Sequence, residues 1–151
     1  MKPRLNYFET EPKIMTAVAE LSSAVDTCGL EAGLLHLVKL RASQINGCSY
    51  CVEMHTREAR ADGETEQRLY LVSAWRDSPL FSARERAALA WTEALTRIAD
   101  GGVTDHLYDE VAREFDAPDL TRLTVAVSMI NTWNRIAISS RMIHPVKRAA
   151  A

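Results

Sequence analysis

Hydrophobic residues recur every three or four positions along most of the chain, which is the period of an amphipathic α-helix. Downstream of Pro12 this period predicts a first helix, whose apolar stripe contains Ile14, Ala17, Val18, Leu21 and Val25. Cys28–Gly29 interrupts the pattern, and a second helix is expected over about 31–44. The Asn46–Gly47 pair is a strong turn signal, so this helix is expected to end there.

The helical period continues through the middle of the chain. Helices are expected over about 48–62 and 64–75, with a loop around Pro79. Ser82, followed three residues later by Glu85, forms a capping-box pattern. This pattern predicts the start of a further helix that continues to about residue 99.

Two more helices are expected towards the C-terminus. Thr104 is the expected N-cap of one, and Pro118 stands at the head of the other, whose residues 123–137 form a nearly continuous apolar surface. No segment alternates with a period of two, as a half-buried strand would. The pattern therefore predicts an all-α protein with one domain over residues 1–151. Its core is expected at about 11–141, with terminal arms that are candidates for oligomer contacts.

Composition and charge narrow the function classes. The chain is 47% hydrophobic and 25% charged, with a formal net charge of −2, and its one adjacent pair of basic residues is Lys147–Arg148. A nucleic-acid partner is therefore not expected. Residues 1–8 lack the apolar core of a signal peptide, and no stretch reaches the ~18 apolar residues of a membrane span. We expect a cytoplasmic protein without a membrane partner.

The candidate chemistry lies at Cys48, Cys51 and His55, which are three and four residues apart. On a helix this spacing places the three side chains on one face. A thiol reacts as its thiolate, and because a free cysteine has a pKa of ~8.5, it must be activated. After one sulfur attacks an oxidant and becomes a sulfenic acid, the other can condense with it to form a disulfide. The pattern predicts a redox-active pair.

Two arguments differ on which cysteine attacks first. The helix start, with its free N–H groups and positive dipole end, favours a thiolate at Cys48. His55, in contrast, can take the proton from Cys51 or stabilise its thiolate. We expect Cys51 to attack and Cys48 to resolve, because a positioned base both activates the nucleophile and delivers a proton.

The run from Leu37 to Cys48, which reads LVKLRASQINGC and continues through Cys51 and His55, resembles the core motif of the AhpD/carboxymuconolactone decarboxylase superfamily. Further similar segments extend the likeness over about residues 30–140; they are Trp75–Arg76, Glu85–Trp91 and Asn131–Arg135. The resemblance implies the all-helical AhpD fold, with the Cys-x-x-Cys motif at the start of a helix.

The resemblance also implies antioxidant hydroperoxide reduction by the cysteine pair. Carried over by motif, Cys51 would attack the peroxide, Cys48 would resolve, and His55 would belong to a proton relay. The implied reductant is a dithiol such as dihydrolipoamide, supplied free or by a lipoyl-protein, and no tightly bound cofactor is expected. The family further implies a homotrimer or homohexamer.

One position departs from the family pattern, which has a glutamate twelve residues before the first cysteine. This chain has His36 there, and a histidine supplies no fixed negative charge at neutral pH. His36 is therefore a candidate relay residue that could pass a proton but would lack the negative charge of the glutamate. Otherwise it is a core or interface histidine. Glu53 points away from Cys51 on the same helix, which leaves Glu93 as a possible replacement. Tyr50 stands where the family often has a histidine.

Other interpretations stay open at this point. Zinc binding is one, since His36 could complete a Cys2His2 set with the motif residues. A decarboxylase-like proton-transfer enzyme is a second, although that reaction has no need of a dithiol. A non-enzymatic redox-sensing oligomeric module is a third. Cys28, a lone cysteine in an apolar segment, is interpreted as a packing residue.

Overall fold

The computed structural model describes residues 1–145, and the Lys147–Arg148 pair lies outside them. Within the described residues the regular structure is entirely helical, which confirms the all-α prediction. None of these helices is both long and apolar enough to cross a membrane. The α-helices are α1 (Tyr7–Thr10), α2 (Pro12–Asp26), α3 (Ala32–Asn46), α4 (Ser49–Ala61), α5 (Glu66–Leu71), α6 (Ala83–Thr96), α7 (Asp105–Ala112) and α8 (Ala117–Ser140), and the 3-10 segments are η1 (Val72–Asp77) and η2 (Ile98–Asp100).

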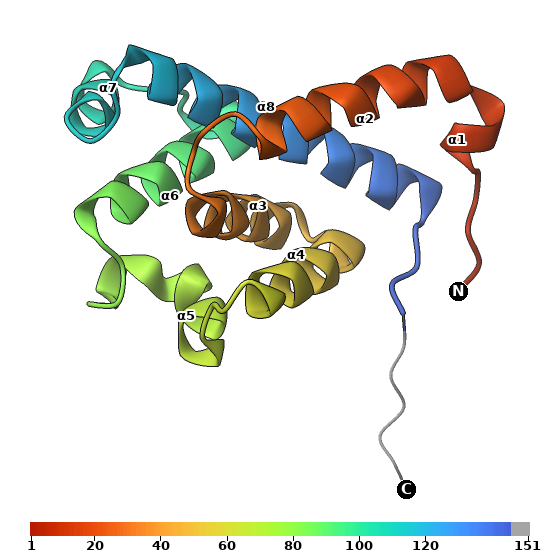
Figure 1. Ribbon diagram of the computed structural model, residues 1–151, viewed down its shortest axis with the longest axis horizontal. Coiled ribbons are helices and arrows are strands. Elements are labelled where there is room, and N and C mark those ends of the chain that lie inside the picture. The colour runs from red at the N-terminus through yellow and green to blue at the C-terminus, as the bar shows by residue number, and fades with distance from the viewer. Residues whose placement is uncertain (146–151) are drawn as a thin grey trace, which may run out of the picture.

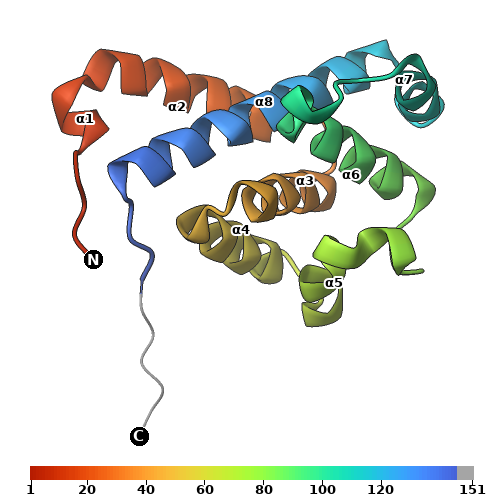
Figure 2. The same ribbon diagram turned by 180° about the vertical axis from the view of Figure 1, so that it is seen from behind.

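Helix α3 is the inner element of the fold. It packs against α4, α6 and α8, and both views show it among these helices, while α2 crosses α8 at an angle (Figure 1, Figure 2). Leu37, Val38 and Leu40 of α3 are almost completely buried. Each such side chain contributes about 1.5–3 kcal/mol through burial. The core therefore holds α3 firmly, and its C-terminal end carries the turn into the cysteine motif.

Most helix starts follow the capping signals in the sequence. The Ser82 hydroxyl accepts a hydrogen bond from the Glu85 N–H at 3.2 Å, and the Glu85 carboxylate accepts one from the Ser82 N–H at 2.8 Å. This is the capping box that the sequence predicts. Thr104 caps α7 in the expected way, by accepting from the Leu107 N–H at 3.2 Å.

Two of the expected helices differ from the sequence prediction, and the short helix α1 was not predicted. The helix expected over 64–75 is divided into α5 and η1, with non-helical backbone at Ala74 (φ −116°, ψ 25°). The division leaves Trp75 buried, with its Nε1–H donating to the Glu93 carboxylate at 2.9 Å. This tertiary contact competes with the local helical preference. The helix expected to reach residue 99 also stops earlier, at Thr96, and continues as η2.

Glu93 is the buried centre of an ionic cluster that joins α3, α6 and η1. Its carboxylate binds Arg41 at 2.7 Å and also pairs with Arg76. Burial alone would raise the pKa of Glu93, but the hydrogen bonds from Arg76, Trp75 and Arg41 outweigh it and hold the pKa below the ordinary 4.5. Glu93 therefore has a structural role in the core.

We expect Glu93→Gln to lower the free energy of unfolding by about 3 kcal/mol at pH 7, because it leaves the largely covered Arg41, whose side chain is 13% exposed, without its counter-charge. Urea unfolding followed by circular dichroism measures this. Since the folded-state pKa is lowered, the ionic contribution is present above the ordinary pKa and is lost as the pH falls through the folded value. The difference from wild type should therefore shrink in acid.

The matched control is Glu110→Gln, which removes a carboxylate from an exposed pair with His106 at 3.7 Å. An exposed pair of this kind contributes about 1 kcal/mol or less. Equal losses in the two variants, or a Glu93 effect that does not change with pH, would contradict the account of the cluster.

Candidate active site: a buried cysteine pair beside a histidine

The turn between α3 and α4 sets the position of the cysteine motif. Gly47 ends α3 in the left-handed region (φ 69°), a conformation that favours glycine at this place. The next N–H, of Cys48, donates to the Ser43 carbonyl at 3.0 Å. Cys48 is then the N-cap of α4, and its Sγ accepts a hydrogen bond from the Cys51 N–H at 3.3 Å. The motif thus begins at the helix start, as the sequence predicts.

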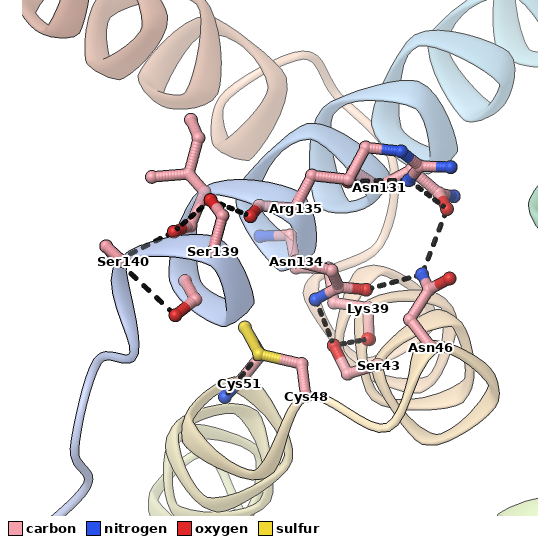
Figure 3. Close-up of a disulfide and its surroundings, with 12 residues drawn as sticks. Lys39, Ser43, Asn46, Cys48, Cys51, Asn131, Asn134, Arg135, Ser139 and Ser140 are labelled. Carbon is pink, nitrogen blue, oxygen red and sulfur yellow. Dashed lines mark hydrogen bonds between the residues drawn. A yellow bond between two sulfur atoms is a disulfide. The ribbon is translucent and has the colours of Figure 1, made fainter. Parts of the chain in front are cut away.

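A chain of polar side chains holds this turn against α8 (Figure 3). The Asn46 Nδ2 donates to the side-chain oxygens of Asn131 at 3.0 Å and Asn134 at 2.8 Å. Asn134 donates in turn to the Ser43 Oγ at 3.0 Å, and that hydroxyl donates to the Lys39 carbonyl at 2.7 Å. Asn134 and Ser43 have no exposed surface. Buried polar groups whose hydrogen bonds are satisfied favour one arrangement, so the network orients the motif.

Cys48 and Cys51 form a disulfide in this structure, with Cα atoms 5.4 Å apart. Both residues are almost fully buried, at 1% and 2% exposure. They pack against Ala137 of α8, with Tyr50 and Met142 at the edge of the cluster. The two sulfurs can therefore form a bond without any long-range movement of the chain.

His55 lies one helical turn after Cys51 and is 5% exposed. Its Nδ1 is 3.0 Å from a carboxylate oxygen of Glu58, and its Nε2 is buried and has no hydrogen-bond partner among residues 1–145. The hydrogen bond from His55 lowers the pKa of Glu58; burial opposes this, and the charges of His55, Lys39 and His36 lower it further. An ionised carboxylate only accepts hydrogen bonds. We therefore assign the proton to Nδ1, which leaves the Nε2 lone pair free to act as a base.

A cavity of about 340 Å³ opens beside the disulfide, and most of its wall is apolar. Cys51, His55 and Glu58 reach its surface, whereas Cys48 does not. The remaining wall comes from α1, α2, α3, α4 and α8 and from the segment after α8: Phe8, Ser22, Val25, Asp26, Lys39, Tyr50, Met54, Ala126, Met129, Ile130, Trp133, Ala137 and Met142. A small organic molecule in this cavity would meet Cys51 and His55 together.

The other candidate residues lie elsewhere. The His36 Nε2 is 2.7 Å from the carboxylate of Asp62, which follows α4, and His36 does not line the cavity. Glu93 is bound to Arg41 and Arg76 in the ionic cluster. The residue that sequence reasoning missed is Glu58. Its spacing of three residues from His55 was a usable signal, because positions i and i+3 are neighbours on a helix.

A metal site has no support in the described part of the chain. Residues 1–145 contain no group of three or more His, Cys, Asp or Glu side chains arranged to hold a metal ion. The zinc interpretation requires His36 beside the cysteines, but its Nε2 is paired with Asp62.

Comparison with known proteins identifies the family. The Carboxymuconolactone decarboxylase family matches the chain over residues 12–94, which is more than half of its length. The chain belongs to the carboxymuconolactone decarboxylase family. This match confirms the resemblance that the sequence motif indicates, and the cysteine pair and His55 lie within the matched segment.

Relatives of this carboxymuconolactone decarboxylase family protein share almost its whole length. It is 37% identical to the uncharacterised protein YdfG of Bacillus subtilis, over 92% of this chain and 95% of YdfG. It is 45% identical to ATU0492 of Agrobacterium tumefaciens, a protein of unknown function with a suggested identity as the antioxidant defence protein AhpD. The crystal structure of ATU0492 matches with a TM-score of 0.94, covering 97% of this chain and all of the other.

A more distant structure shares the fold. The alkylhydroperoxidase AhpD core of an uncharacterised peroxidase-related protein from Ralstonia eutropha matches with a TM-score of 0.80 at 18% identity. The match covers 91% of this chain and 74% of that one. The likeness confirms the AhpD-like helical fold.

The cavity predicts that the two thiols of the motif differ in reactivity, because Cys51 lines it and Cys48 does not. In the reduced protein we expect iodoacetamide to modify Cys51 at least about tenfold faster than Cys48, because Cys51 reaches the cavity and lies beside a base. Mass spectrometry of the alkylated peptides measures both rates. The experiment uses the Cys28→Ser variant, since Cys28 is a partly exposed free thiol. Equal rates, or faster modification of Cys48, would contradict the assignment of Cys51 as the accessible sulfur.

Proposed function

We propose that this protein is a thiol-dependent hydroperoxide reductase that cycles Cys48 and Cys51 between a dithiol and a disulfide. The observation that supports this most is the pairing of the two sulfurs beside a cavity that also exposes His55. A purely structural disulfide has no need of a cavity or of a neighbouring base. The suggested antioxidant role of ATU0492 is in line with the proposal.

The first step is attack by the Cys51 thiolate on the peroxide. His55 takes the thiol proton at Nε2, and the sulfur then attacks the terminal oxygen of the hydroperoxide ROOH. The O–O bond breaks, and the departing alkoxide receives the proton from His55 and leaves as the alcohol ROH. Cys51 is now a sulfenic acid, so the sulfur has been oxidised by two electrons and the peroxide reduced by two.

The second step forms the observed disulfide. The Cys48 sulfur attacks the Cys51 sulfur, the S–O bond breaks, and water leaves with the proton of the Cys48 thiol. A dithiol reductant then opens the disulfide by thiol–disulfide exchange and is itself oxidised to a disulfide. The sum is ROOH plus dithiol giving ROH, water and the oxidised reductant.

The surroundings of the sulfurs support an organic substrate and a slender reductant. The apolar wall of the cavity suits a hydroperoxide with a hydrocarbon group. Because Cys51 is only 2% exposed, the reductant must reach it through the cavity. A flexible dithiol arm such as dihydrolipoamide, free or on a lipoyl-protein, fits this requirement.

Assembly and location complete the proposal. On α2 the side chains of Ile14 and Leu21 are 62% and 50% exposed, and together with Val125 of α8 they leave an apolar surface uncovered in the single chain. Such a surface supports a homo-oligomer, for which the family implies a trimer or hexamer. We place the protein in the cytosol, where a cysteine pair of this kind is more often catalytic than structural.

The test is turnover of cumene hydroperoxide with dihydrolipoamide by wild type and single variants. We expect Cys51→Ser to lower the turnover rate at least about a thousandfold, because it removes the nucleophile. We expect His55→Ala to lower the turnover rate about a hundredfold, because it removes the base. Cys48→Ser should stop after one oxidation, with a Cys51 sulfenic acid that dimedone traps.

Cys28→Ser is the matched control, since Cys28 is the other cysteine and lies outside the cavity wall. It should turn over at the wild-type rate. Retained peroxide turnover in a Cys48→Ser, Cys51→Ser double variant would refute the dithiol mechanism. Oxidation of the wild type by peroxide without turnover under any dithiol would instead indicate a redox sensor.

A further inference from the structure

Glu58 carries the new inference, which rests on the proposed function because it concerns the same histidine. We propose that Glu58 is the positioning residue of the site: its carboxylate holds the His55 ring in the tautomer that presents an unprotonated Nε2 to Cys51. The carboxylate would thus come from the same helix as the histidine, rather than from position 36 or from Glu93.

The contact follows from the helix geometry. Glu58 is three residues after His55 on α4, and the Glu58 oxygen lies 3.0 Å from the His55 Nδ1. The two side chains are exposed to different degrees, with 7% for His55 and 46% for Glu58. The ring therefore lies inside the protein, whereas the carboxylate reaches solvent. Both side chains belong to the wall of the same cavity.

The other carboxylates near the site are engaged elsewhere. Asp62 pairs with His36, and Glu93 pairs with the arginines of the ionic cluster. Glu53, on the same helix, lies 3.8 Å from Arg57. Among the described residues, Glu58 is thus the acidic side chain that contacts His55.

The contact with His55 also keeps this carboxylate ionised. The hydrogen bond from His55 lowers the pKa of Glu58 the most, against the opposing effect of burial, and the charges of His55, Lys39 and His36 add smaller effects in the same direction. Lys39 is itself paired with Asp26 of α2, and Tyr50 is a further titratable side chain in the cavity wall. An anionic partner at Nδ1 holds the ring orientation and stabilises the positive charge that the ring gains when Nε2 takes a proton.

The experiment compares Glu58→Ala with Glu58→Gln, in which the amide oxygen can still accept from Nδ1–H. Glu53→Ala is the matched control, because it removes a carboxylate from the same helix. Nitrogen NMR of the reduced proteins reports the His55 tautomer at neutral pH. The alkylation rate of Cys51 as a function of pH reports its thiolate fraction, measured in a Cys28→Ser, Cys48→Ser background.

We expect the wild type to carry the ring proton on Nδ1. Glu58→Ala should transfer it to Nε2, move the midpoint of the alkylation curve to higher pH, and slow the alkylation of Cys51 at neutral pH about tenfold. Glu58→Gln should keep the proton on Nδ1 and slow the alkylation of Cys51 less than Glu58→Ala does. Glu53→Ala should match wild type in both measurements.

Two results would overturn the inference: the same His55 tautomer in Glu58→Ala as in wild type, or alkylation that changes less than about twofold. Because neither measurement uses peroxide, the inference and the proposed function fail separately. A wild type that ignores peroxide, with the expected Glu58 effects present, would refute the hydroperoxide reductase and leave the positioning role intact.

Discussion

The site depends on one constraint, which is that Cys48 caps the N-terminus of α4 in a turn that hydrogen bonds hold against α8. Gly47 allows the chain to leave α3 in the left-handed conformation, and the Asn46–Asn134–Ser43 network ties the turn to α8. From an N-cap, the residue three positions later is the nearest side chain along the helix. The disulfide therefore joins two residues that are already neighbours on one helical turn, and the hydrogen bonds of the Asn46–Asn134–Ser43 network do not involve either sulfur.

Burial and electrostatics then give the two sulfurs different roles. Both are shielded from solvent, but only Cys51 borders the cavity where His55 lies. A buried imidazole without a fixed tautomer would be a poor base, because either nitrogen could hold the proton. The carboxylate of Glu58, kept ionised by His55 and the basic groups of α3, removes that ambiguity. The residues proposed as base, nucleophile and resolving thiol, which are His55, Cys51 and Cys48, all come from one short stretch of chain.

Features governed by local spacing were predictable from the sequence, whereas pairings across the fold were not. The capping box at Ser82, the turn at Gly47 and the cysteine motif follow local rules, and the structure has them as expected. The break in the helix expected over 64–75, with its non-helical residue Ala74 inside η1, was not predictable, because a contact between segments distant in the chain decides it. The pairing of His36 with Asp62 has the same origin. Glu58 is different, because its spacing of three residues from His55 is local and is enough to predict the contact.

The central claim is that the two electrons released when the Cys48–Cys51 disulfide forms reduce the hydroperoxide to its alcohol and water. The most direct measurement mixes the fully reduced wild type with one equivalent of cumene hydroperoxide and determines the intact mass, the cross-linked peptide and the alcohol released. The account predicts a loss of about 2 Da per chain, a Cys48–Cys51 linked peptide and one equivalent of alcohol. An unchanged mass with the hydroperoxide intact, or oxygen added to methionine with both thiols still free, would contradict it.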